Sequence, residues 1–144
     1  MATISEHIIR KAAMLMHALA ALLRTRGPYA ETERLYRESL AVKEALGDSR
    51  SVAVTQSSLA LVMLARGEYG EAERLFKQAL ETMRQVRDLR SVAAIQMQWG
   101  TLMMQREQST AGHDLLAQAR RGFVAIGLPN WAAIVNQILA NFEK

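Results

Sequence analysis

The sequence predicts an all-α protein built from stacked pairs of antiparallel helices. Its composition favours helix, because alanine, leucine, arginine, methionine, glutamine and glutamate are abundant and the chain has only two prolines. Aromatic residues make up 6% of the chain, which argues against a sheet-rich fold. The strongest observation is an internal repeat: residues 27–66 align without a gap on residues 67–106, and 15 of the 40 positions are identical.

The length of 144 residues suits one domain of ordinary size, which we expect to span residues 1–144. Half of the residues are hydrophobic and none is a cysteine, which excludes a disulfide framework, a thiolate metal site and a catalytic thiol. The net charge of +4 comes from charges scattered along the chain. A mixed-charge surface therefore explains the basic character better than a nucleic-acid site does.

The first helix is expected over residues 5–26. Its apolar run at 12–23 follows two basic residues, as in a signal peptide, but Glu6 precedes the run and His17 interrupts it. The run is also shorter than the roughly 20 apolar residues that span a bilayer. Because the segment aligns with the later repeats, we expect a structural helix and a cytoplasmic protein.

Three further helices are expected over residues 30–46, 50–66 and 70–87. Apolar residues in the middle one recur at three- and four-residue spacing, the period of a helix that packs one face. Gly67 is placed to end that helix, and the acidic residues that follow it suit the first turn of the next. Asp88, like its repeat equivalent, is placed to cap the helix after it.

The last helices are expected over residues 90–106, 109–126 and 130–142. The final one is a capping helix with an apolar stripe from Trp131 to Phe142, although a capping helix usually has a polar outer face. If the outer face is apolar, either the array continues in a larger protein or two chains dock end to end. The helix pairs themselves are expected at about 5–46, 50–87 and 90–126.

The helix pairs carry large, aromatic and small residues at fixed positions. The middle pair has Leu59, Ala60, Tyr69, Ala72, Phe76 and Ala79. The other two pairs have Leu19, Ala20, Tyr29 and Tyr36, and then Trp99, Gly100, Leu116 and Ala119. This pattern resembles the tetratricopeptide repeat. The resemblance implies a right-handed superhelical α-solenoid of about seven helices, which binds other polypeptides.

Two features depart from the usual pattern. The period of 40 residues exceeds the usual repeat of about 34, so we expect longer second helices. This length is similar to the long variety found in kinesin light chains, Pins-type polarity adaptors and bacterial signalling proteins. The third pair also lacks the turn glycine and the aromatic residue, since it has Glu107 and Ser109 at those positions.

The resemblance also implies a partner-binding groove, because the first helices of such pairs line the concave face. The groove positions are Met14, His17, Ala21, Arg24, Val54, Ser57, Leu61, Leu64, Ala94, Met97, Thr101, Met104, Ile134, Gln137 and Asn141. An apolar, methionine-bearing trough of this kind accepts an amphipathic helix or an extended apolar segment. The alternative is that neighbouring helices close over these residues and bury them as core.

The sequence predicts no catalysis, no metal site and no cofactor. Its three histidines are far apart, and the neighbouring residues His113 and Asp114 point apart on a helix. Arginines recur at the repeat period, at positions 26, 66 and 106 and again at 50 and 90. They form either a track for phosphate or an acidic peptide, or helix-end charges that pair with nearby acidic residues.

We therefore expect a non-catalytic scaffold that binds a peptide or helix of another polypeptide, with no membrane segment. The chain is similar to the repeat segments of bacterial signalling proteins. One alternative is a homo-oligomerisation module that docks through the C-terminal helix, and a third hypothesis is a nucleic-acid-binding helical array.

Overall fold

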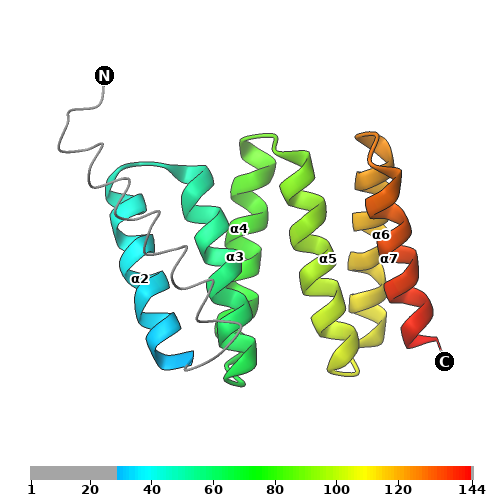
Figure 1. Cartoon of the computed structure of the whole chain (residues 1–144), viewed down its shortest axis with the longest axis horizontal. Coiled ribbons are helices and arrows are strands. Elements are labelled where there is room, and N and C mark those ends of the chain that lie inside the picture. The colour runs from blue at the N-terminus through cyan, green and yellow to red at the C-terminus, as the bar shows by residue number, and fades with distance from the viewer. Residues whose placement is uncertain (1–28, 144) are drawn as a thin grey trace. The chain divides into compact units, whose positions relative to one another are not determined.

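The computed structural model of the chain describes residues 29–143, which form six helices. They are α2 (Tyr29–Ala45), α3 (Ser49–Ala65), α4 (Tyr69–Gln85), α5 (Leu89–Gln105), α6 (Ser109–Ala125) and α7 (Pro129–Phe142) (Figure 1). Each begins within one residue of its expected start, and no strand occurs among residues 29–143. The predicted all-α repeat fold is confirmed, while the helix expected over 5–26 lies outside the described residues. None of the helices in the described part is both long and apolar enough to cross a membrane.

The helices follow one another at a constant spacing. Each of them starts 20 residues after the one before, and α2 to α6 have 17 residues each. The expectation that the second helices take up the extra length is therefore wrong, since first and second helices are equally long. Two helices packed side by side bury apolar surface along their whole length only when they are equally long. This accounts for the equal division of the extra residues between first and second helices.

One type of turn joins the six described helices. The residue after each C-cap has a positive φ, at Gly47, Gly67, Arg87, Glu107 and Gly127. The amide that follows it donates to a carbonyl five residues back, as Gln108 N does to Met103 O at 2.9 Å. This is the Schellman motif, which satisfies the last carbonyls of a helix. Glu107 therefore makes the same turn without glycine, at φ 63°, and the third pair keeps the geometry of the others.

Aspartate caps begin the first helix of two pairs. Asp48 accepts a hydrogen bond from the backbone N–H of Ser51 at 3.3 Å, and Asp88 accepts one from the backbone N–H of Ser91 at 3.0 Å. Each aspartate also accepts from the hydroxyl of the same serine at 2.8 Å. The predicted caps are confirmed, and they explain why α3 and α5 begin where they do.

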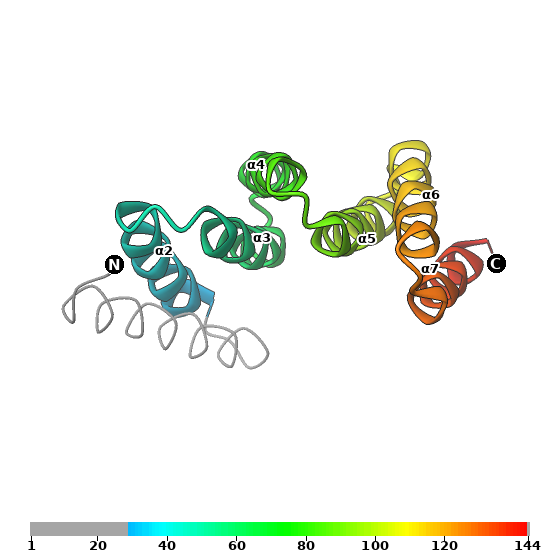
Figure 2. The ribbon, with the colours of Figure 1, turned by 90° about the horizontal axis from the view of Figure 1, so that it is seen from above.

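The chain divides into two compact units, and the division falls within α4, between Thr82 and Met83. In the first unit α2 packs against α3, as Figure 2 shows from above. The core of this unit is apolar and includes Tyr36, Leu59, Ala60, Val62, Ala72, Leu75, Phe76 and Ala79.

A buried lysine interrupts that apolar core. Lys43 is 5% exposed, and its Nζ donates to Oγ1 of Thr55 at 2.8 Å. Burial lowers the pKa of Lys43, while the negative charge of Asp48 acts in the opposite direction. The first unit therefore carries a charged group at a position that the later repeats fill with Met83 and Phe123.

In the second unit α6 packs against both α5 and α7 (Figure 2). Its core consists of Ala93, Leu116, Ala119, Phe123, Ala132, Val135 and Leu139. The ring of Trp131 stacks on that of Phe123, with 5.7 Å between the ring centroids.

Two glycines let α5 and α6 approach closely. A Cβ atom added at Gly112 would lie 2.9 Å from the carbonyl oxygen of Gly100 and 2.9 Å from the backbone nitrogen of Met104. A Cβ atom at Gly100 would lie 3.1 Å from the carbonyl oxygen of Gly112. The first unit has Ala60 and Ala72 at the corresponding repeat positions, so the glycine pair belongs to the α5–α6 contact alone among the described helix pairs.

Candidate partner-binding site

The groove positions of the first unit lie along α3. Val54 is 40% exposed, whereas Ser57, Leu61 and Leu64 are half-buried. The hydroxyl of Ser57 donates to the carbonyl oxygen of Val54 at 2.8 Å, so its polar atom is satisfied within the helix. The remaining N-terminal positions, Met14, His17, Ala21 and Arg24, lie outside the described residues, as do Leu19 and Ala20 of the repeat pattern.

The groove positions of α5 in the second unit form an uncharged, partly exposed face. Ala94, Met97, Thr101 and Met104 are all half-buried. The side chains of Ala94, Met97 and Met104 pack against the core of the unit. The hydroxyl of Thr101 donates to the carbonyl oxygen of Met97 at 2.7 Å, which leaves it no free hydrogen. One edge of this face therefore belongs to the core and the other reaches solvent.

The groove positions of α7 are more open. Ile134 is 45% exposed, and Gln137 and Asn141 are exposed as well. The amide nitrogen of Gln137 donates to Oδ1 of Asn141 at 3.3 Å, one turn further along the helix. In the second unit an apolar face on α5 and a polar, uncharged face on α7 are thus both accessible.

The residues of the repeat pattern lie where helices contact one another, with two exceptions. Tyr36, Leu59, Ala60, Ala72, Phe76, Ala79, Gly100, Leu116 and Ala119 are buried, and Trp99 is half-buried. Tyr29 and Tyr69 are 41% and 42% exposed, because each is the first residue of its helix. The small residues of the pattern have their packing role, as the close approach of Gly100 and Gly112 illustrates.

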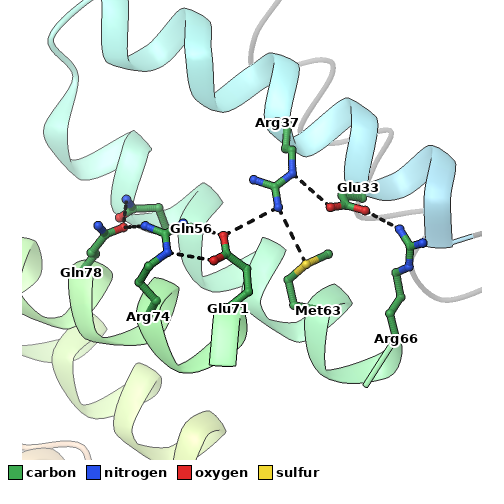
Figure 3. Close-up of polar contacts among 8 residues, drawn as sticks. All are labelled: Glu33, Arg37, Gln56, Met63, Arg66, Glu71, Arg74 and Gln78. Carbon is green, nitrogen blue, oxygen red and sulfur yellow. Dashed lines mark hydrogen bonds and ion pairs between the residues drawn. The ribbon is translucent and has the colours of Figure 1, made fainter. Parts of the chain in front are cut away.

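A network of ion pairs joins the helices of the first unit (Figure 3). Glu33 of α2 binds both Arg37, at 3.1 Å, and Arg66 at the end of α3. Arg37 also reaches Glu71 of α4 at 3.7 Å, and Glu71 pairs with Arg74. Arg66 is therefore paired with an acidic residue, which agrees with the helix-end interpretation and not with a track for phosphate.

The charged groups of this network shift one another's pKa values. The hydrogen bond from Arg74 lowers the pKa of Glu71, and burial opposes this effect only in part. Glu71 in turn raises the pKa of Arg74. Both side chains of this partly exposed pair are therefore charged at neutral pH, and each pair of this kind contributes little on its own.

Sequence reasoning did not single out these acidic partners, although the repeat held the signal. Glu31 and Arg34 form the same i,i+3 pair as Glu71 and Arg74, one repeat earlier. Gln56 donates to Gln78 and Gln96 donates to Gln118, both at 3.1 Å between the side-chain amides. Identical polar residues 40 positions apart were the signal for such pairs, which repeat because the helix contacts repeat.

An open hollow of about 390 Å³ lies at the start of α6, lined by Ser109, Thr110, His113 and Asp114. His113 and Asp114 therefore border one space, although they are neighbours on a helix. Among the described residues, no group of three or more histidine, cysteine, aspartate or glutamate side chains is placed to hold a metal ion.

Comparison with known proteins agrees with the helix-pair architecture. The tetratricopeptide repeat family matches residues 11–85, which is more than half of the chain and runs to the end of α4. No curated protein matches the chain. The repeats of this family generally mediate protein–protein interaction and act as non-catalytic scaffolds. The matched residues, the paired helices and their buried small residues together show that the chain belongs to the tetratricopeptide repeat family.

Proposed function

We propose that the protein is a cytoplasmic, non-catalytic scaffold that binds an amphipathic helix or an extended apolar segment of another polypeptide. In the first unit the binding surface is the exposed flank of α3. In the second unit it is the face formed by α5 and α7. The family assignment supports protein binding in general, and the chemistry of these faces supports the kind of partner.

The observation that carries this proposal is the uncharged, half-buried face of α5. Met97 and Met104 pack on the core at one edge and keep part of their surface in solvent. Methionine side chains are flexible and polarisable, so they adapt to apolar partners of different shape. A partner helix gains affinity on such a face by covering the exposed part of these side chains.

A charge placed on this face tests the proposal. Peptides of 16 residues selected from a random displayed library on the full chain serve as the probe. For each selected peptide we expect the variant on the face that binds it, Leu61→Glu in the first unit or Met97→Glu in the second, to weaken binding at least tenfold, because a carboxylate would be desolvated without a partner. Val124→Glu is the matched control, since Val124 is 61% exposed on α6, outside the predicted face.

Far-UV circular dichroism separates the two interpretations of these residues. Helical signal that is retained together with lost binding supports a binding face. Loss of the helical signal in Met97→Glu would show that the residue is core, and equal affinity of all three variants would contradict the proposed site.

A further inference from the structure

The turn between α4 and α5 carries three arginines at a spacing of three residues. Arg84 lies in the last turn of α4, Arg87 has the positive φ of the turn, and Arg90 lies in the first turn of α5. All three are exposed, and none of them forms an ion pair with another described residue. Their positive charges are therefore available to a partner.

A fourth arginine comes from the next helix of the second unit. Arg121 is exposed on α6, and it also forms no ion pair with a described residue. It precedes Gly122, where an added Cβ atom would lie 3.3 Å from the Cβ atom of Ala93. Because Ala93 is one turn beyond Arg90, the end of α6 lies beside the start of α5 (Figure 1). Arg121 thus adds to the positive potential at this end of the second unit.

Arginines of the first unit differ in that glutamates neutralise them. Its arginines in ion pairs with glutamate are Arg34, Arg37, Arg66 and Arg74. The α4–α5 turn has one acidic residue, Asp88, and its carboxylate already caps α5. The turn therefore keeps an excess of positive charge that no described residue balances.

Two large apolar side chains are exposed among the arginines of the turn. Val86 is 41% exposed and Leu89 is 55% exposed. Each of them directly precedes an arginine, so cationic and aliphatic side chains alternate along residues 84–90. A partner that covers this turn must therefore supply apolar groups as well as negative charge.

The turn between α2 and α3 shows that the fold does not require this composition. In the first unit the residues that line an open hollow of about 220 Å³ at this place include Glu44, Gly47 and Ser49. The residues 40 positions later are Arg84, Arg87 and Leu89. The two turns have the same backbone conformation, since φ is 70° at Gly47 and 58° at Arg87. Glycine adopts this conformation more readily than arginine does, so turn formation does not explain Arg87.

We infer that the α4–α5 turn binds an acidic segment of another polypeptide, in which aspartate or glutamate alternates with aliphatic residues. The planar guanidinium group of arginine donates to both oxygens of a carboxylate, and this pairing is stronger than a neutral hydrogen bond. The aliphatic side chains of the segment cover Val86 and Leu89. Nucleic acid fits less well, because residues 84–90 include no aromatic ring on which a base could stack.

This inference goes beyond the proposed function, because it concerns a second surface and a charged partner. The turn does not include the methionines of α5 on which the proposed function depends. An acidic peptide that fails to bind would leave the test with Met97→Glu unaffected, so the two results can be told apart.

Fluorescence anisotropy with a labelled peptide and the full chain tests the inference. The probe is a peptide of four Asp-Asp-Leu repeats, and two control peptides have serine in place of every aspartate or of every leucine. We expect the probe to bind at least tenfold more tightly than either control peptide, with an affinity that falls as salt is added. Absence of saturable binding, or equal affinity for the probe and either control peptide, would overturn the inference.

A variant that copies the first unit locates the binding site. Arg84→Glu/Arg87→Gly/Leu89→Ser introduces the residues that the first unit has in the same turn, so circular dichroism should show an unchanged helix content. We expect this variant to bind the probe at least tenfold more weakly, because it loses two arginines and an exposed aliphatic side chain.

Arg34→Gln/Arg37→Gln/Arg74→Gln is the matched control, since it changes the net charge by the same three units on exposed residues of the first unit. Its affinity for the probe should stay within about twofold of the original, because distant exposed charges are screened by salt. If the control loses binding as strongly as the turn variant does, the peptide binds elsewhere and the inference is wrong.

Two competitors distinguish other anionic partners, namely a 12-nucleotide single strand of DNA and phosphatidylserine-containing vesicles. We expect both to bind the chain more weakly than the probe does. If either binds more tightly than the probe and loses its affinity in the turn variant, the turn recognises nucleic acid or a membrane surface, and the inference of an acidic polypeptide is overturned.

Discussion

Gly112→Ala perturbs the close contact between α5 and α6. Alanine normally stabilises a helix interior by about 1 kcal/mol relative to glycine, so a simple propensity argument expects a gain. At Gly112, however, the added Cβ would lie 2.9 Å from the carbonyl oxygen of Gly100 and 2.9 Å from the backbone nitrogen of Met104. Both atoms belong to the α5 backbone, so they cannot move aside unless the two helices separate.

The magnitude follows from these two opposing effects. Overpacking a well-packed contact costs about 1–3 kcal/mol, and a backbone neighbour that cannot yield places this site at the upper end. After the gain in helix propensity is subtracted, we expect Gly112→Ala to lower the free energy of unfolding by about 2 kcal/mol. Gly70→Ala is the matched control, because a Cβ atom there meets nothing within 4 Å. The control should be neutral or stabilising by up to about 1 kcal/mol.

Urea unfolding followed by tryptophan fluorescence measures the difference. The chain has two tryptophans, Trp99 and Trp131, and both lie in the second unit together with the perturbed contact. A lower midpoint with an unchanged slope reports a change in stability and not in the extent of unfolding. If Gly112→Ala proves as stable as the unsubstituted chain, the close approach of α5 and α6 is not a constraint, and the reasoning is refuted.

Three further predictions concern the turns, the buried lysine and the caps. Glu107→Gly should stabilise the chain by roughly 0.5–1 kcal/mol in urea unfolding, because glycine adopts a positive φ without the strain of a side chain; no gain would mean that Glu107 is unstrained. The lowered pKa of Lys43 means that the folded chain holds this proton less tightly than the unfolded chain, so stability should rise with pH from the lowered pKa towards the ordinary value of 10.5. Lys43→Met should raise the free energy of unfolding at pH 7 by about 1 kcal/mol and remove most of its increase with pH. If the stability of the unsubstituted chain does not increase with pH, the effect of burial on Lys43 is contradicted. Asp88→Ala should cost about 1 kcal/mol through loss of the cap, whereas Gln108→Ala, whose side chain makes no cap hydrogen bond, should stay within about 0.5 kcal/mol; equal losses would count against the cap.

The helix boundaries were predictable because their causes are local. Asp48 and Asp88 cap their helices through a serine three residues away, and Gly67 supplies the positive φ of a turn within its own segment. The turn at Glu107 lacks that local signal. It forms the same structure because the helices on both sides, α5 and α6, pack against each other.

The candidate site was predictable only in part. The sequence placed Met97 and Met104 on one face of a helix, since this follows from helical spacing alone. It left open whether the face is groove or core, because burial depends on how closely the next helices approach. That approach depends on pairs far apart in the chain, such as Gly100 with Gly112 and Gln96 with Gln118.

The sequence by itself determined the class of fold, the position of every described helix and the family, because capping, periodicity and repetition are properties of short segments. The tertiary structure determined which side chains of those segments contact one another and which are buried. It paired Glu33 with Arg66, buried Lys43 with its Nζ hydrogen-bonded to Thr55, and left one uncharged face of α7 exposed to solvent. These outcomes depend on distances between helices, and no local pattern of residues encodes such distances.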